Sequence, residues 1–297
     1  MYPEDSGAAA QGGGGDYYPA SGIKSKLAYH LEGLVPIILI LIIALFLAVK
    51  FDFITTSTPV LGIIAGIIEP SEKISVLLIS DSDNSISPNI IETFHINADL
   101  VKYKIRPAYD LTINPDQKIE GYDIIIMDGL NYIPRSLGQA IVNYVKGGGK
   151  LITVKDAGIR SGIVLPNGQI EGYAPDVLGW EETFDDVIPV SCEKNEEGIP
   201  GCIDKMYVSG KLYREDEKHE IMKGFEEVPQ EPNSYKDFEV LNVNYTANEL
   251  AYIRGSNYQK PFPGIVEKKL VFGKSIYFNY DPGTTPGILM STLDYLK

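Results

Sequence analysis

The sequence has few of the residues that build metal sites and disulfide scaffolds, and its charge has the wrong sign for binding nucleic acid. Its 297 residues include two cysteines, three histidines and one tryptophan. Two thiols cannot form a disulfide-dense scaffold or a four-thiolate zinc site. Forty acidic residues against 26 basic ones give a net charge of −14. Because nucleic-acid binders neutralise phosphates with clustered Lys and Arg, we expect no nucleic-acid partner.

The chain does contain enough apolar material for a packed core. Apolar residues make up 44% of the sequence and charged residues 22%. This balance excludes disorder over the whole chain. The length suits one large domain or two small ones.

Near the amino terminus the sequence predicts a membrane anchor. The run LVPIILILIIALFLAV, residues 34–49, carries no charge, and further apolar residues extend it to residue 54. A buried soluble helix would carry a polar stripe, and a cleaved signal peptide would begin closer to the terminus and end in a small-residue cleavage site. We therefore predict an uncleaved, single-pass transmembrane helix that contacts the lipid bilayer through residues 34–54.

The predicted anchor divides the chain into four parts. They are a disordered tail over 1–22, rich in Gly, Ala and Ser, the anchor helix over 23–54, a juxtamembrane linker over 55–72 and a large domain over 73–297. Lys24 and Lys26 precede the apolar run, whereas the large domain is strongly acidic. We therefore place the protein in the cell membrane, with its carboxyl-terminal domain outside.

Two local patterns agree with an extracellular domain. Cys192 and Cys202 bracket a short loop that can close as a disulfide in an oxidising compartment, and two unpaired thiols are the alternative. Asn244 begins the triplet Asn-Tyr-Thr, which is the acceptor pattern for glycosylation. One such triplet is expected by chance in a chain of this length, so the pattern adds little.

From residue 73 onward the pattern predicts alternating strands and helices. The continuous apolar runs at 74–80 and within 122–129 suit parallel strands that are buried on both faces. Between them Pro88 begins a predicted helix. Pro134 begins another, whose apolar residues recur every four positions until a triple glycine ends it. This order predicts right-handed crossovers and an α/β domain with a mostly parallel sheet.

Residues 159–202 interrupt this rhythm. Between Glu171 and Glu197 there are nine acidic residues and one lysine, which predicts an irregular, solvated acidic insertion. A loop that binds a basic partner is the alternative. Beyond it, alternating segments predict a second, more antiparallel half, and Pro286 begins a closing helix.

Four segments of the domain occur in the order typical of a known superfamily. They are YDIIIMDG, NYVKGGGKLITVKDAG, HEIMKGF and PGIVEKKLVFGKSIYFNYDPG. Residues 73–297 thereby resemble the class I glutamine amidotransferase-like superfamily, in particular its trehalose-utilisation-like branch without amidase activity. The resemblance implies a flavodoxin-like sheet with helices on both faces. Similar domains also occur in membrane-anchored auxiliary subunits of transport systems.

The resemblance argues against the chemistry of the superfamily's enzymes. These enzymes carry Cys-x-Gly on a sharp turn after a strand, where the thiol is the nucleophile. The matching positions here are Asp156, Ala157 and Gly158, so the turn glycine is kept and the nucleophile is replaced. The expected late His–Glu pair is missing as well, because no histidine follows His219. We assign ordinary structural roles to the three histidines, His30, His95 and His219.

Aspartates follow the predicted strands. Asp81 and Asp83 come after the first strand, and Asp128 and Asp156 come after two others. The carboxyl ends of parallel strands share one edge of a sheet, where ligands usually bind. Three explanations stay open: capping of helices and turns, a Ca²⁺ or Mg²⁺ site, and a metal-dependent hydrolase with Asp81 as nucleophile. The candidate ligand edge therefore consists of Asp81, Asp83, Asp128, Asp156 and Gly158.

Together these features predict a pseudoenzyme. The chain is expected to be a single-pass, extracytoplasmic, non-catalytic α/β module that needs no cofactor. It would bind a protein or carbohydrate partner, or form part of a surface or membrane assembly. The alternatives are an auxiliary subunit of a membrane transport complex and a metal-dependent hydrolase that uses the strand-end aspartates. The sequence identifies neither the partner nor the oligomeric state.

Overall fold

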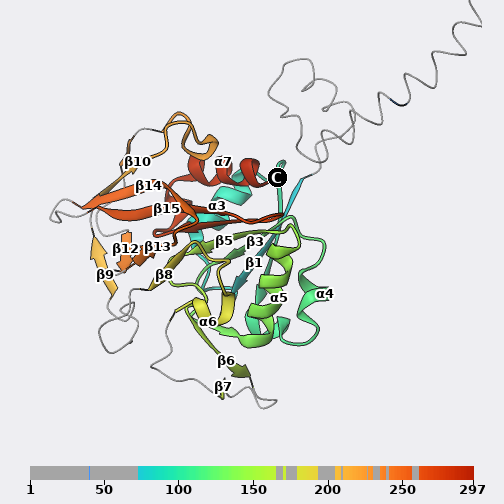
Figure 1. Cartoon of the computed structure of the whole chain (residues 1–297). Helices are drawn as coiled ribbons and strands as arrows, with labels where there is room; N and C mark the ends of the chain where they lie inside the picture. Colours follow the sequence, from blue (N-terminus) through green and yellow to red (C-terminus); the bar gives the residue numbers. More distant parts are fainter. Residues whose placement is uncertain are drawn as a thin grey trace, which may run out of the picture. The chain divides into compact units, whose positions relative to one another are not determined.

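The computed structural model describes most of the large domain. The described residues are 40, 73–164, 170–171, 179–192, 205–208, 210–225, 227–229, 235–238, 241–255 and 261–297. The chain forms two compact units, Met1–Pro70 and Ser71–Lys297, and the second contains all of the described residues except residue 40 (Figure 1). In the part of the chain that the structure describes, no helix is long and apolar enough to span a bilayer. The predicted tail, anchor and linker lie outside it, apart from residue 40, so the anchor stays a prediction.

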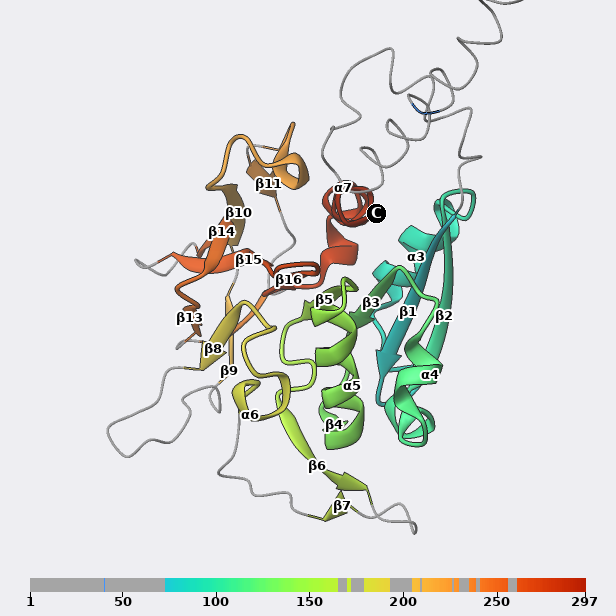
Figure 2. The same ribbon diagram turned by 45° about the vertical axis from the view of Figure 1, so that its right-hand side comes forward.

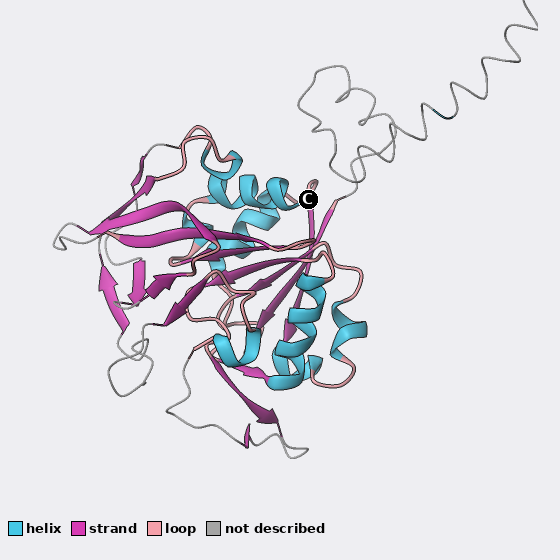
Figure 3. Cartoon of the chain, in the orientation of Figure 1, coloured by secondary structure: helices cyan, strands magenta, loops and turns pink. Residues whose placement is uncertain are grey.

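A nine-stranded sheet forms the centre of the domain (Figures 1 and 3). Its strand order is β11-β10-β14-β15-β16-β5-β3-β1-β2. Neighbouring strands at the β2 end pair in parallel. The parallel strands are β1 (Ile74–Ser80), β2 (Val101–Pro107), β3 (Ile124–Met127), β5 (Lys150–Val154) and β16 (Lys274–Phe278). The α/β class and the parallel pairing predicted from the buried apolar runs are confirmed.

The other half of the sheet is antiparallel, as the alternating segments predicted. Its strands are β10 (Gly210–Arg214), β11 (Glu227–Pro229), β14 (Ala247–Gly255) and β15 (Phe262–Lys269). Smaller sheets join β12 (Tyr235–Phe238) to β9 (Lys205–Val208), β13 (Leu241–Val243) to β8 (Val190–Cys192), and β4 (Tyr132–Pro134) to β6 (Arg160–Val164) and β7 (Ile170–Glu171).

Helices cover both faces of the sheet, as the resemblance implied. On one face lie α3 (Pro88–Ile96) and α7 (Pro286–Leu296), and on the other lie α4 (Pro115–Ile119), α5 (Arg135–Lys146) and α6 (Glu181–Phe184) (Figure 2). Short 3₁₀ turns complete the fold: η1 (Ala108–Leu111), η2 (Glu220–Met222) and η3 (Pro282–Thr284).

Strand residues alternate between two separate cores. In β1, Leu77 and Ile79 pack with α5, whereas Val76 and Leu78 pack with α3 and α7. This alternation follows from the two-residue period of a strand and explains why the strand is apolar at every position. Burying each such side chain stabilises the fold by about 1.5–3 kcal/mol, so the two cores hold the helices in place.

The segment predicted as an irregular, solvated insertion differs from that prediction in its described residues. Trp180, Phe184, Val187 and Ile188 are buried in the α5-side core, and β8 pairs with β13. The acidic side chains beside them, such as Asp185 and Asp186, are exposed. The high density of acids concealed a short apolar series that packs inward, so part of this segment belongs to the core.

The parallel strands give the domain two distinct edges. At the carboxyl edge, β1, β3, β5 and β16 end. The chain continues from β1 to α3, from β3 through β4 to α5, from β5 to β6 and from β16 through η3 to α7. At the amino edge, the chain enters β1 and the tight turn between β15 and β16 leads into β16, which begins opposite Lys150 of β5. The carboxyl end of α7 also lies near the beginning of β1 (Figures 1 and 2).

Candidate functional site

At the carboxyl edge, two buried aspartates from different strand ends hold the beginning of α3. Asp128 follows β3, and its Oδ2 accepts a hydrogen bond from the backbone N–H of Ser87 at 2.7 Å. Asp281 follows β16, and its Oδ2 accepts from the Ser87 hydroxyl at 2.6 Å and from the Asn89 amide at 2.9 Å. Its Oδ1 accepts from the backbone N–H of Gly283 at 2.9 Å. Ser87 also caps α3 by accepting from the N–H of Asn89 at 3.2 Å.

The surroundings of Asp128 shift the pKa of its carboxyl group upward. Burial raises the pKa of Asp128, and the neighbouring Asp281 carboxylate adds to the rise. The hydrogen bond from Ser87 and the positive charge of Lys155 oppose it without cancelling it. The charged form of Asp128 is therefore destabilised by its surroundings. Its carboxylate still contributes to the fold, because it accepts the hydrogen bond of a buried backbone N–H.

The two aspartates that follow β1 have different surroundings. Asp81 is half-buried, and its Oδ2 accepts from the backbone N–H and the side-chain amide of Asn131 at 3.0 and 2.7 Å. Asp83 is exposed and lines an open hollow of about 420 Å³ beside α3. The other lining residues are Asn84, Ile86, Pro88, Ile91, Glu92 and His95. Of the predicted ligand edge, only Asp83 faces this hollow.

The turn after β5 contains the positions that match the family's Cys-x-Gly. Lys155 adopts a left-handed conformation with φ of 52°, one residue before Asp156. Gly158 has φ of 72°, a value that favours glycine, and its N–H donates to the carbonyl of Leu130 at 2.7 Å. The strained, non-glycine residue of this turn is thus a lysine, whose N–H donates to the carbonyl of Phe278 at 2.7 Å.

The described ranges contain no group of three or more His, Cys, Asp or Glu side chains fit to hold a metal ion. The predicted Ca²⁺ or Mg²⁺ site therefore stays a prediction without a defined set of ligands. Cys192 is buried at the end of β8, and its predicted partner Cys202 lies outside the described residues. The side-chain nitrogen of Asn244, which would carry a sugar, donates to the carbonyl of Ile188 at 2.8 Å. Cys192 is disulfide-bonded, and Cys202 is the other cysteine of the sequence. The glycan stays a prediction.

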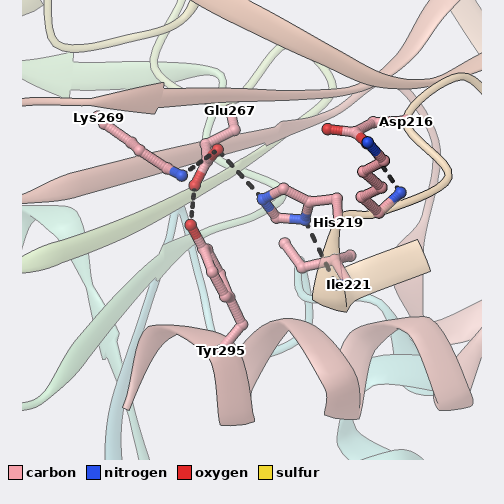
Figure 4. A network of polar contacts seen from close by, with 7 residues as sticks. Asp216, His219, Ile221, Glu267, Lys269 and Tyr295 are labelled. Carbon is pink, nitrogen blue, oxygen red and sulfur yellow. Dashed lines mark hydrogen bonds and ion pairs between the residues drawn. The ribbon is translucent and has the colours of Figure 1, made fainter. Parts of the chain in front are cut away.

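A second polar cluster lies on the face covered by α7 and consists of His219, Glu267, Lys269 and Tyr295 (Figure 4). The Glu267 carboxylate is fully buried, and its Oε2 lies 3.2 Å from Nε2 of His219 and 3.5 Å from Nζ of Lys269. Tyr295 of α7 donates its hydroxyl to Oε1 of the same carboxylate. The backbone N–H of Ile221 donates to Nδ1 of His219 at 3.4 Å, so the proton of a neutral imidazole lies on Nε2, facing Glu267.

This cluster is arranged for stability. Burial alone would raise the pKa of Glu267, but the hydrogen bonds from His219 and Tyr295 and the Lys269 charge outweigh burial and hold that pKa below its usual value. Burial and the bond to Glu267 raise the pKa of the Tyr295 phenol, which stays a hydrogen-bond donor. Glu267 lies opposite Ile276, the middle residue of β16, which pairs with Ile152 of β5, three residues before the turn at Lys155. The His–Glu pair is therefore not beside the Cys-x-Gly positions.

Sequence reasoning missed several of the residues that matter at these sites. Asp281 had the same signal as the predicted aspartates, an acid shortly after a buried strand, within an Asp-Pro-Gly bend. Glu267 was detectable as a charged residue on the inward register of a strand, two positions after Ile265. His95 is exposed, and its Nε2 lies 3.1 Å from the Tyr103 hydroxyl.

Comparison with known proteins shows the fold of the domain. No protein-family model and no curated protein matches the sequence. Among solved structures, a ThuA-like protein from Bacteroides uniformis superposes with a TM-score of 0.50 at 15% identity, covering 75% of this chain and 90% of that one. A β-galactosidase from Rahnella sp. R3 superposes with a TM-score of 0.50 at 14% identity, covering 80% of this chain.

The two likenesses differ in how much of the other protein they cover. The present chain spans 34% of the β-galactosidase, about a third of its length, but most of the ThuA-like protein. At such low identity the likeness concerns the fold alone. The structural neighbours therefore support the class I glutamine amidotransferase-like fold of the trehalose-utilisation type that the sequence resemblance implied.

Proposed function

We propose that the chain is a single-pass, membrane-anchored, extracytoplasmic module that binds a protein or carbohydrate partner and is not a catalyst. The single observation that carries this proposal is the use of the buried carboxyl-edge aspartates. Asp128 and Asp281 hold the amino terminus of α3 through Ser87. Carboxylates engaged in this way brace the scaffold and are poor candidates for a nucleophile or a general base.

The turn after β5 supports the same proposal. An amidotransferase needs a thiol at this turn, and the position that matches the thiol holds Asp156 instead, one residue after Lys155 with its left-handed backbone. The cysteines, Cys192 and Cys202, lie elsewhere in the sequence. The edge therefore keeps the shape of an enzyme site without its reactive group.

The hollow beside α3 is the binding surface that we propose. Exposed Asp83 and Glu92 supply negative charge, and half-buried Ile91 and exposed Pro88 supply apolar contact area. A few polar groups on a mainly apolar wall are typical of binding sites. Because both charges are negative, the partner is expected to present hydrogen-bond donors or positive charge.

The experiment is photo-cross-linking of the full chain in intact membranes. A photoreactive phenylalanine analogue replaces exposed Asn84 on the rim of the hollow. We expect one cross-linked partner, and its yield should fall about tenfold when Asp83→Lys and Glu92→Lys are combined, because the charge at the rim is reversed. Glu217→Lys, at an exposed position in the loop between β10 and η2, is the matched control and should leave the yield unchanged.

Two outcomes would contradict the proposal. One is a cross-linking yield that stays the same when Asp83→Lys and Glu92→Lys reverse the charge at the hollow. The other is an enzymatic activity that depends on a metal ion. In that case the chain would turn over a substrate and bind Mg²⁺ or Ca²⁺, and Asp81→Asn or Asp156→Asn would abolish both the turnover and the metal binding. That second outcome would establish the metal-dependent hydrolase instead.

A further inference from the structure

Large apolar side chains are exposed at the amino edge of the sheet. Val271 and Phe272, in the turn between β15 and β16, are 89% and 72% exposed. Ile96 and Leu100, between α3 and β2, are 75% and 53% exposed. The carbonyl of Leu100 accepts from the N–H of Ile74 at the start of β1, which places this second pair at the same edge. The two pairs lie at different strands along one edge, beside β16 and beside β1, and exposed apolar groups along an edge indicate an interaction surface.

The turn that carries Phe272 does not need an aromatic side chain for its own structure. The N–H of Leu270 donates to the carbonyl of Gly273 at 2.9 Å and closes the turn. Gly273 is required, because a Cβ there would lie 1.9 Å from the carbonyl oxygen of Val145. Val271 and Phe272 lie at the tip, so their exposure calls for a contact outside the domain.

Lysines surround these apolar groups, in a chain whose net charge is −14. Seven lysines lie at the amino edge or in the elements that end there: Lys73, Lys102, Lys146, Lys150, Lys269, Lys274 and Lys297. Two of them form ion pairs inside the domain, Lys146 with Asp185 and Lys269 with Glu267. The exposed acids at the same edge are fewer: Asp99, Glu120, Asp123 and Asp294, with Asp185 beside Lys146. Lysine ammonium groups around exposed aromatic and aliphatic side chains suit the headgroup region of an anionic bilayer.

The path of the chain leads from the predicted anchor to this edge. The anchor is predicted to end at residue 54, and the chain enters the sheet at Lys73, immediately before β1. The linker between them contains the apolar run from Val60 to Ile68, which is too short to span a bilayer and suits its surface. The tether therefore reaches the domain on the edge where Phe272 and the lysines lie.

We infer that the amino edge of the sheet rests on anionic lipid headgroups, with Val271 and Phe272 inserted at the membrane interface. Lys73, Lys102, Lys274 and Lys297 lie against lipid phosphates, and the carboxyl edge with its hollow faces away from the bilayer. This inference rests on the proposed membrane anchor and adds an orientation to it. The exposed apolar side chains of the amino edge therefore contact the surface of the bilayer in which the anchor lies.

The test uses tryptophan fluorescence in the full chain. The chain has one tryptophan, Trp180, which is 1% exposed and gives a constant background. Phe272→Trp adds a second indole at the tip of the turn. The chain is reconstituted into vesicles of phosphatidylglycerol and phosphatidylcholine with brominated acyl chains, which quench indoles at the interface. We expect the added fluorescence to fall at least about twofold relative to unbrominated vesicles.

Tyr109→Trp is the matched control, because Tyr109 is an aromatic residue, 60% exposed, in η1 at the carboxyl edge. Its added fluorescence should be unaffected by bromination. If the chain sediments with the vesicles and the tryptophan of Phe272→Trp is not quenched, the inference is wrong and the anchor stands. If the chain stays in the supernatant, the proposed anchor fails, and the inference fails with it. Equal quenching in vesicles of zwitterionic lipid alone would contradict the inference that the edge binds anionic headgroups.

Discussion

Replacement of Glu267 by glutamine is expected to lower the free energy of unfolding by about 2–4 kcal/mol at neutral pH. The fully buried carboxylate accepts hydrogen bonds from His219 and Tyr295 and lies 3.5 Å from Nζ of Lys269. A glutamine can offer only one oxygen, so its amide nitrogen would face a donor. Urea unfolding of the full chain in detergent micelles, followed by the fluorescence of buried Trp180, measures the loss.

The pH dependence of this loss has a definite sign. The pKa of Glu267 is lower in the folded protein than in the unfolded chain, so the carboxylate stabilises the fold above the unfolded value of 4.5. That contribution disappears as the pH falls through the folded pKa. The gap between the wild type and Glu267→Gln should therefore be largest near neutral pH and shrink below about pH 4.

Two further variants separate this network from a general effect of removing charge. Tyr295→Phe should cost about 1.5–3 kcal/mol, because its hydroxyl donates to a charged acceptor, and its effect should not add to that of Glu267→Gln. Glu217→Gln removes an exposed carboxylate and should change stability by less than about 0.5 kcal/mol. Equal losses for Glu217→Gln and Glu267→Gln would contradict the structural role of the network.

The fold was predictable wherever burial left a pattern in the sequence. The apolar runs of β1 and β3 predicted parallel strands because each is buried on both faces. Pro88 and Pro286 marked the first residues of α3 and α7. The prediction differed from the structure between Trp180 and Val190, where acidic neighbours concealed buried apolar residues. The composition of a long stretch counts buried and exposed side chains together. It therefore does not reveal a short series of buried apolar residues among exposed acidic ones.

The site was predictable only to the level of one edge of the sheet. Strand-end aspartates were expected to gather, and the structure does join Asp128 and Asp281 through Ser87. Which carboxylates brace a helix and which face a hollow depends on long-range packing, because Ser87 and Asp281 are 194 residues apart. The left-handed backbone of Lys155 likewise has no signature in the sequence, since φ above zero is expected of glycine.

The hydrogen bonds of Asp128 and Asp281 at the beginning of α3 predict that replacing each aspartate by asparagine has a different effect on stability. Asp281→Asn should lower the free energy of unfolding by about 2–3 kcal/mol, because both carboxylate oxygens accept buried hydrogen bonds. An amide nitrogen in either position would face a donor. The beginning of α3 would then loosen from η3, against which it packs so closely that a Cβ at Gly283 would lie 2.3 Å from the backbone nitrogen of Ile90.

Asp128→Asn makes the same chemical change beside it and should alter stability by about 1 kcal/mol or less. Its amide oxygen can still accept from the N–H of Ser87, and loss of the charge relieves the penalty that burial and Asp281 impose. Because the pKa of Asp128 is raised in the folded state, the wild type itself gains stability as the pH falls toward the unfolded value of 3.8. Any advantage of Asp128→Asn over the wild type should therefore vanish in acid. Equal destabilisation by both substitutions at neutral pH would show that the two carboxylates contribute equally to stability. It would contradict the claim that ionised Asp128 is destabilised by burial and by Asp281.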